Sequence, residues 1–193
     1  SQFGFLDEVL TDSDGSLYKL SLSISDIAWD ADSKKLYEGL RAKNIEFRNL
    51  QNLAGLPALT GERVISNDVE NDPRAGGVPA GHPGISTFMG LPLYFADNLV
   101  GVAGVANRAG GYDAAMARFL DPFLAACASI IHASRQAAKE EMMMSALRER
   151  EKFLDAVVEN IPDMIFVKDA ADLRFIRLNR AAEKLLGYSR QDL

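Results

Sequence analysis

The chain has 193 residues, of which 48% are hydrophobic, so it can bury the core of one large domain, or of one domain and part of a second. Its net charge of −6, without a local basic patch, excludes nucleic-acid binding. No run of about eighteen apolar residues occurs, and the N-terminus lacks the basic start of a signal peptide, so we expect a cytoplasmic segment with no direct membrane contact.

Two strand-like segments open the chain. Phe3 to Leu10 is followed by Leu17 to Ser25, in which apolar and polar residues alternate as in a half-buried strand. The sequence between them, Asp12 to Gly15, is typical of a hairpin turn. The next expected elements are a helix from Asp32 to Lys43, a strand from Ile45 to Leu50, a short helix from Asn52 to Thr60 and a strand from Val64 to Ser66.

Asn67 to Gly84 contains four glycines and three prolines, which predicts a long loop of the kind that often carries function. The two strongest strand patterns follow, Thr87 to Phe95 and Leu99 to Ala106, joined by a turn-forming Asp-Asn pair. Gly101 and Gly104 allow neighbouring groups to approach the second strand closely. This order predicts an α+β fold, with helices on the faces of a mainly antiparallel sheet.

A helical pattern then runs from Ala114 to Glu159, with Asp113 as its cap and Pro122 as a point where the first turns can split off. Its first part repeats apolar residues, Cys127 among them, at three- and four-residue steps. We expect this part to pack on its own domain. The later part, from Arg135 onward, is charged, so it lies either in solvent or against a partner helix.

The later part of this helix carries an apolar stripe. Leu147, Leu154 and Ile161 are seven residues apart, with Met143 and Val157 offset by about half a heptad. This spacing predicts a homodimer through a parallel connector helix. The alternative is a solvated helix that ends near Met144.

Three successive features of the sequence resemble a bacterial GAF domain. They are the block from Ser86 to Leu93 with its Pro-Leu pair, the strand ending in Asn107-Arg108, and Tyr112 followed by Phe119-Leu120. The resemblance covers residues 1–132 and implies a central antiparallel sheet with helices on its faces. Family members usually have a helix before the first strand, so the terminal packing layer is expected to be incomplete, disordered in part, or completed by a neighbour.

Phe153 to Asp169, followed by Leu178 to Ser189, looks like the opening of a PAS domain. We therefore expect a signalling helix linker at 133–159 and the N-terminal fragment of a PAS-like domain at 160–193. A fragment of about 32 residues is too short to close a core alone. Tandem GAF and PAS modules imply the input part of a bacterial sensor histidine kinase of a two-component system. A diguanylate cyclase or phosphodiesterase parent is the alternative.

GAF-like sheets bind ligands between one sheet face and the segment covering it, so the resemblance and the strand alternation together nominate a pocket for an unknown small molecule. The nominated residues are Phe47, Asn49, Asp68, Arg74, His82 and Phe88. The plainer alternative is that the two phenylalanines only fill the core. A ligand-free dimerisation scaffold and a haem-based gas sensor using His82 are further alternatives; the cofactor remains unknown.

No catalytic or metal-binding motif is recognisable, so we expect no catalysis in this chain and no metal site. Asp68, Glu70 and Asp72 alternate but lack the calcium-loop pattern. His132 lacks the neighbours of a phosphoacceptor histidine and is expected to be an ordinary helix-surface or interface residue. Cys127, the only cysteine, is expected in the core.

Overall fold

The computed structural model describes residues 1–25, 45–76 and 82–187. The chain divides into two compact units, Ser1–Arg135 and Gln136–Leu193, and each is described by itself. The helix expected from Asp32 to Lys43 lies outside the described residues. Within those residues, no helix is long and apolar enough to cross a membrane.

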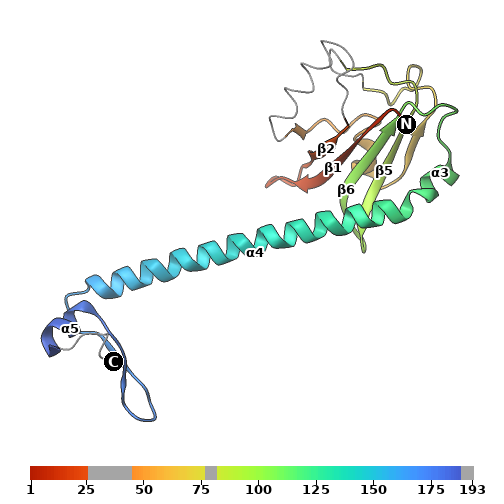
Figure 1. Cartoon of the computed structure of the whole chain (residues 1–193). Helices are drawn as coiled ribbons and strands as arrows, with labels where there is room; N and C mark the ends of the chain where they lie inside the picture. The colour runs from red at the N-terminus through yellow and green to blue at the C-terminus, as the bar shows by residue number, and fades with distance from the viewer. Residues whose placement is uncertain (26–44, 77–81, 188–193) are drawn as a thin grey trace. The chain divides into compact units, whose positions relative to one another are not determined.

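The first unit is built on a six-stranded antiparallel sheet of order β3-β2-β1-β6-β5-β4 (Figure 1). The two hairpins predicted from the sequence supply its four long strands, and β1 pairs with β6 at the centre. The strands are β1 Phe3–Thr11, β2 Leu17–Ile24, β3 Glu46–Phe47, β4 Val64–Ser66, β5 Phe88–Phe95 and β6 Asn98–Ala106.

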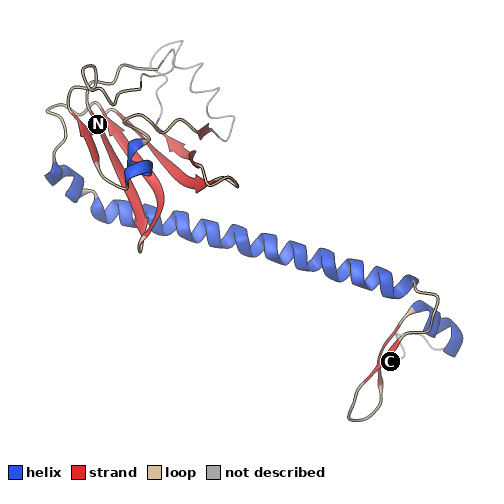
Figure 2. Cartoon of the chain, turned by 180° about the vertical axis from the view of Figure 1, so that it is seen from behind, coloured by secondary structure: helices blue, strands red, loops and turns tan. Residues whose placement is uncertain are grey.

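The sheet buries a core on each of its two faces. On one face, Met89 and Leu91 pack against helical residues that include Leu124 and Cys127. On the other, Phe88 and its neighbours pack beside the short helix α2, Leu56–Thr60. Figure 2 shows α2 in front of the sheet, with the first part of α4 on the opposite side. These two faces are called the α2 face and the α4 face below.

The two elements before β4 are shorter than predicted, because asparagine side chains turn the backbone. Asn49 Oδ1 accepts a hydrogen bond from Gln51 N, which ends the pairing of β3 early. Asn52 Oδ1 accepts one from Gly55 N, so α2 begins only at Leu56.

The long helical pattern forms two helices, α3 Ala114–Phe119 and α4 Asp121–Asn160. Asp113 caps α3 by accepting a hydrogen bond from Met116 N, as predicted. The break at Leu120 agrees with the expected effect of Pro122, which suits a first helical turn because it has no N–H to donate. Because α4 is helical for 40 residues, the alternative of a helix ending near Met144 is wrong.

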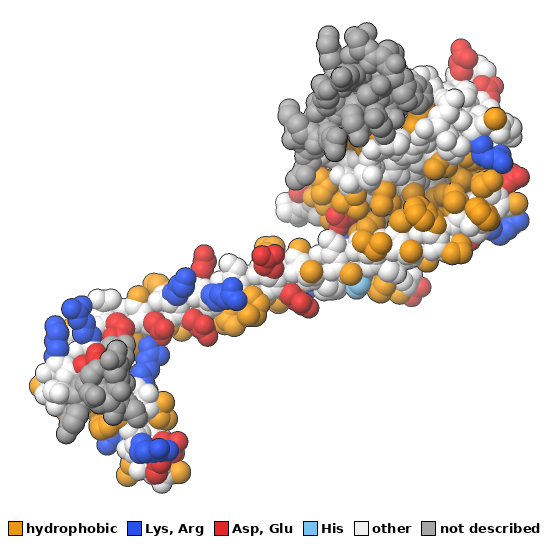
Figure 3. All heavy atoms as spheres, viewed as in Figure 1, with side chains coloured by type: hydrophobic (Ala, Val, Ile, Leu, Met, Phe, Trp, Pro, Cys, Tyr) orange, Lys and Arg blue, Asp and Glu red, His pale blue; other side chains and the backbone are white. Residues whose placement is uncertain are grey.

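Part of the α4 face stays open. Figure 3 shows hydrophobic side chains gathered on the first unit beside α4. Leu6 and Leu20 are only partly buried, and 47% of Leu22 is exposed. Among the described residues, this part of the α4 face is therefore only partly covered. The thiol of Cys127 is buried there, which raises its pKa and agrees with a core role.

The second unit continues α4 into a two-stranded antiparallel ribbon and a helix. They are β7 Phe166–Lys168, β8 Phe175–Leu178 and α5 Arg180–Leu186. Asn179 caps α5, and Gly187 ends it at a φ of 74°, so both predicted helix signals are confirmed. Of its large apolar side chains, Phe166, Leu173, Ile176 and Leu185 remain exposed.

Candidate functional site

Alternate residues of β1 point to the α2 face of the sheet. Phe3 and Phe5 belong to one core cluster there, and Phe5 also contacts the cluster that contains Val9. The ring of Phe5 stacks on Phe88, with centroids 6.3 Å apart and an angle of 18° between the planes. Aromatic rings from two different strands, β1 and β5, therefore pack together on the α2 face.

Gly104 makes room for the Phe5 ring. It pairs with Phe5 across the sheet, and a Cβ atom at Gly104 would lie 2.2 Å from Phe5 Cε1. The close approach expected from the glycines of β6 is thus confirmed here, because any side chain at this position would displace an aromatic ring of the α2 face.

A charged pair is buried beside these rings. Lys19 Nζ on β2 lies 2.7 Å from Asp7 Oδ2 on β1, and the two side chains are only 4% and 2% exposed. The Lys19 ammonium also lies 4.5 Å from the centroid of the Phe5 ring and 5.3 Å from that of Phe47. The positive charge is therefore held by one carboxylate and two aromatic faces.

The other carboxylate oxygen of this pair lacks a partner. Asp7 Oδ1 is fully buried and has no hydrogen-bond partner among the described residues. Burial raises the pKa of Asp7 above 3.8, and Lys19 offsets this only in part; Ser21 also favours the charged form. A buried carboxylate oxygen without a donor is costly, so it requires an explanation.

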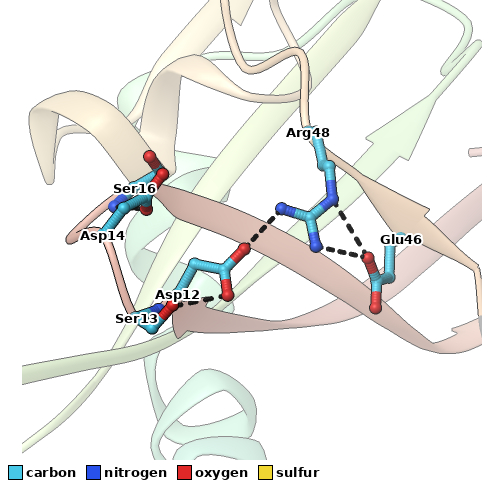
Figure 4. A network of polar contacts seen from close by, with 6 residues as sticks. All are labelled: Asp12, Ser13, Asp14, Ser16, Glu46 and Arg48. Atoms are coloured by element: carbon cyan, nitrogen blue, oxygen red, sulfur yellow. Dashed lines mark hydrogen bonds and ion pairs between the residues drawn. The ribbon is translucent and has the colours of Figure 1, made fainter.

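Phe47 is positioned by pairing and by an arginine. It pairs with Lys19 across β2 and β3. The next residue, Arg48, donates to Asp12 Oδ2 at 2.7 Å and to Glu46 Oε2 at 2.8 Å (Figure 4). Arg48 thus ties the end of β3 to the β1–β2 turn, which holds the Phe47 ring near the Lys19 ammonium.

Three of the six nominated pocket residues, Phe47, His82 and Phe88, lie on the α2 face, where each contacts another ring or the Lys19 ammonium. Phe88 stacks on Phe5, and Phe47 lies near Lys19. The His82 ring meets Phe3 edge-on at 5.8 Å, and its Nδ1 lies 2.7 Å from Pro83 O. Asn49, in contrast, is exposed in the turn after β3.

Asp68 and Arg74 lie elsewhere, in a shallow depression whose lining includes none of the other nominated residues. Arg74 Nη2 donates a hydrogen bond to Asp72 Oδ2 at 2.7 Å, and Asp68 accepts a hydrogen bond from Asn71. The arginine lowers the pKa of the Asp72 carboxyl. Arg74 is therefore paired with Asp72, and Asp68 is hydrogen-bonded to the neutral amide of Asn71, within the same surface loop. No cluster of metal-ligating side chains occurs among the described residues.

Phe5, Asp7 and Lys19 also lie at this site, although none of them was predicted from the sequence. The sequence did contain a sign of Asp7. Phe5, Asp7 and Val9 are alternate residues of one strand, and Phe5 and Val9 both face the core. Charged residues at such inward positions of two successive strands mark a buried ion pair.

On the α4 face, Arg135 fastens α4 to the ends of the central strands. Its Nη2 donates to Val9 O at 2.5 Å and to Val100 O at 3.0 Å, and its Nε contacts Glu8. One turn earlier, His132 stacks on Phe95, with centroids 3.9 Å apart. His132 is thus an interface residue, as expected.

In the second unit, the predicted connector stripe is exposed along α4. Exposed fractions are 63% for Met143, 52% for Leu147 and Leu154, and 42% for Val157, and Ile161 is partly buried. Such a row of exposed apolar side chains at heptad spacing suits pairing with another helix.

Within the second unit, Asn179 joins the end of α4 to the ribbon and to α5. Its side chain is fully buried, and Nδ2 donates to Val158 O at 3.1 Å and to Asp163 O at 2.9 Å. Its Oδ1 accepts from Ile165 N and Ala182 N. One amide therefore connects α4, the segment before β7 and α5.

Comparison with known proteins agrees with this architecture. Residues 1–132 match the GAF domain family, and residues 152–193 match the PAS domain. No curated protein sequence matches the chain.

Solved structures similar to the chain include GAF domains. The GAF domain of a phosphoenolpyruvate-protein phosphotransferase from Coxiella burnetii is 17% identical over 72% of this chain and 76% of its own, with a TM-score of 0.55. A type II free methionine-R-sulfoxide reductase from Thermoplasma acidophilum is 14% identical over 68% and 79%, with a TM-score of 0.50. At these identities the likeness concerns the fold alone. Since the GAF match covers more than half of its residues, the chain belongs to the GAF domain family.

Proposed function

We propose that this chain is the sensory and relay segment of a larger signalling protein. A small molecule binds on the α2 face of the GAF domain, and the signal passes along α4 to the PAS unit. The observation that carries this proposal is the position of β1: Asp7 points to the α2 face, while the next two residues, Glu8 and Val9, hold Arg135 on the α4 face.

The relay follows from these contacts. A shift of β1 at Asp7 displaces the carbonyl of Val9, and with it the guanidinium that fixes α4 where it leaves the first unit. At the other end of the helix, Asn179 binds the carbonyl of Val158 and caps α5. The part of α4 from Arg135 to Val158 is therefore fastened at both of its ends by a hydrogen-bonding side chain whose partners lie in different elements.

We further propose that α4 acts as a pair in a homodimer. The exposed stripe from Met143 to Val157 supports this, because a partner helix of the same sequence would cover it. With barely three heptads the pairing is weak, which suits an element that switches between two arrangements.

The proposed output is a sensor histidine kinase of a two-component system, since GAF and PAS domains in tandem fit such an input region. A diguanylate cyclase or phosphodiesterase is the second candidate. Assaying the full-length parent for autophosphorylation with ATP and for cyclase activity with GTP separates them: phosphorylated protein supports the kinase, and cyclic dinucleotide from GTP contradicts it.

Native mass spectrometry of the chain purified from its own host tests ligand binding. A recurrent bound mass supports the sensory function. Ligand-free protein that no host metabolite stabilises in a thermal-shift screen contradicts it and favours a dimerisation scaffold. A strong visible absorption band after haem supplementation would instead indicate a haem sensor using His82.

A further inference from the structure

We propose that Asp7 Oδ1 anchors the ligand of this domain, and that the ligand is a neutral aromatic compound with an N–H or O–H donor. This inference rests on the proposed function, in that it takes the α2 face to be the ligand-binding face. It adds the residue that orients the ligand and the chemical class that fits.

Within the described part of the chain, one oxygen of the Asp7 carboxylate lacks a hydrogen-bond donor. The Asp7 side chain is 2% exposed, and Lys19 satisfies only its Oδ2. The Ser21 hydroxyl lies near enough to favour the charged form of Asp7, but it does not reach Oδ1 with hydrogen-bond geometry, and Oδ1 has no partner among the described residues. A carboxylate oxygen in a folded core normally accepts at least one hydrogen bond. An N–H or O–H group on a ligand supplies that bond.

The charges of the buried pair restrict the charge of a ligand. The described side chains in contact with Asp7 include one cation, Lys19, whose ammonium is already 2.7 Å from the carboxylate. A cationic ligand would bring a second positive charge beside the first, away from water, where like charges repel strongly. An anionic ligand would repel the carboxylate oxygen that it must approach. A neutral donor avoids both penalties.

The aromatic rings of the α2 face restrict the shape of a ligand. The rings of Phe5 and Phe47 face the Lys19 ammonium, Phe88 stacks on Phe5, and His82 meets Phe3 edge-on at the same face. Flat aromatic compounds pack well against such rings, and one polar contact then fixes their orientation. The combination selects an aromatic ring that carries its donor at the edge.

Indole and 1-methylindole test the donor directly, because they share a ring system and differ at the N–H. In calorimetric titrations of the whole chain, we expect indole to bind at least tenfold more tightly than 1-methylindole, which corresponds to about 1.4 kcal/mol. Tryptamine, which adds a cation, should also bind at least tenfold more weakly than indole. Equal affinity of indole and 1-methylindole overturns the proposal.

The variant Asp7→Leu/Lys19→Met removes both charges together, because removing one would leave the other buried and unpaired. The matched control is Arg63→Gln/Asp121→Asn, which removes an exposed ion pair of the same unit. The first variant should stay folded by circular dichroism and lose indole binding at least tenfold, and the control should bind as the wild type does. Undiminished binding by the first variant means that Oδ1 serves only a buried water.

The outcome for the host compound separates this inference from the proposed function. A compound retained in native mass spectrometry by the wild type and lost from Asp7→Leu/Lys19→Met supports both. If the same compound stays bound to the variant, the domain is a sensor but Asp7 is not its anchor. If indole, phenol and 2-pyridone all fail to bind the wild type at millimolar concentration, the ligand class is wrong even where a host compound is found.

Discussion

Substituting the exposed leucines of α4 should weaken the proposed dimer by a predictable amount. Leu147 and Leu154 each leave 52% of their surface exposed. Complete burial of a leucine side chain contributes about 1.5–3 kcal/mol, so covering this remainder contributes about 1 kcal/mol for each. A symmetric dimer contains every leucine twice, so Leu147→Ala/Leu154→Ala should cost about 3–4 kcal/mol and raise the dimer Kd by more than about a hundredfold.

Sedimentation equilibrium over a concentration series of the whole chain measures this Kd. The matched control is Met142→Ala, which removes a side chain that is 74% exposed on the same helix but lies off the heptad stripe. It should leave the Kd unchanged. A dimer that tolerates both leucine substitutions, or one that Met142→Ala weakens equally, would show that this stripe is not the interface.

Four further outcomes follow from the contacts. Arg135→Gln should lower the stability of the first unit by about 2 kcal/mol in urea unfolding, because it removes charge-assisted hydrogen bonds to two carbonyls from a partly exposed side chain. An unchanged urea midpoint would show that Arg135 does not fasten α4 to the sheet. Asn179→Ala should cost about 3 kcal/mol and speed amide exchange in α5, since it leaves several buried backbone groups unpaired; unaltered exchange would refute this. Gly104→Ala should cost about 1–3 kcal/mol in thermal unfolding by displacing Phe5. Burial raises the pKa of Asp7 in the folded state above its unfolded value of 3.8. The free energy of unfolding should therefore fall as pH rises from 3.8 through the folded-state pKa. Urea titrations over this pH range should show the fall in the wild type and not in Asp7→Leu/Lys19→Met.

The features that local sequence determines were predictable. The β5–β6 hairpin shows in two apolar runs around a turn, and the caps Asp113 and Asn179 precede helical patterns by the expected spacing. Pro122 marked the break between α3 and α4 for the same reason. Each of these signals acts within a few residues, so no tertiary contact was needed to read it.

The candidate site depends on register instead. Asp7 pairs with Ser21 across the hairpin only because the register shifts between Leu6 and Asp7, and this places Lys19 diagonally opposite the carboxylate. The sequence does not reveal such a shift. Arg135 meets Val9 across 126 residues of chain, and that contact depends on how α4 crosses the sheet.

The nominated charges illustrate the same limit. Asp68 and Arg74 lie in the loop expected to cover the pocket, but both side chains form hydrogen bonds with residues two or three positions away in the same loop. Local polar contacts of this kind follow from loop conformation, which glycine and proline content alone does not determine. Their assignment to the ligand site stays a prediction.

Amide hydrogen exchange of the chain purified from its host, compared with the same protein refolded after its bound compound has been removed, tests the relay most directly. If α4 relays the signal, exchange should change in β1 around Val9 and along α4 as far as Asn160, and the change in α4 should be lost in Arg135→Gln. Altered exchange confined to residues before Ile131, with α4 beyond it unaffected, would contradict the proposal that the GAF domain signals through this helix.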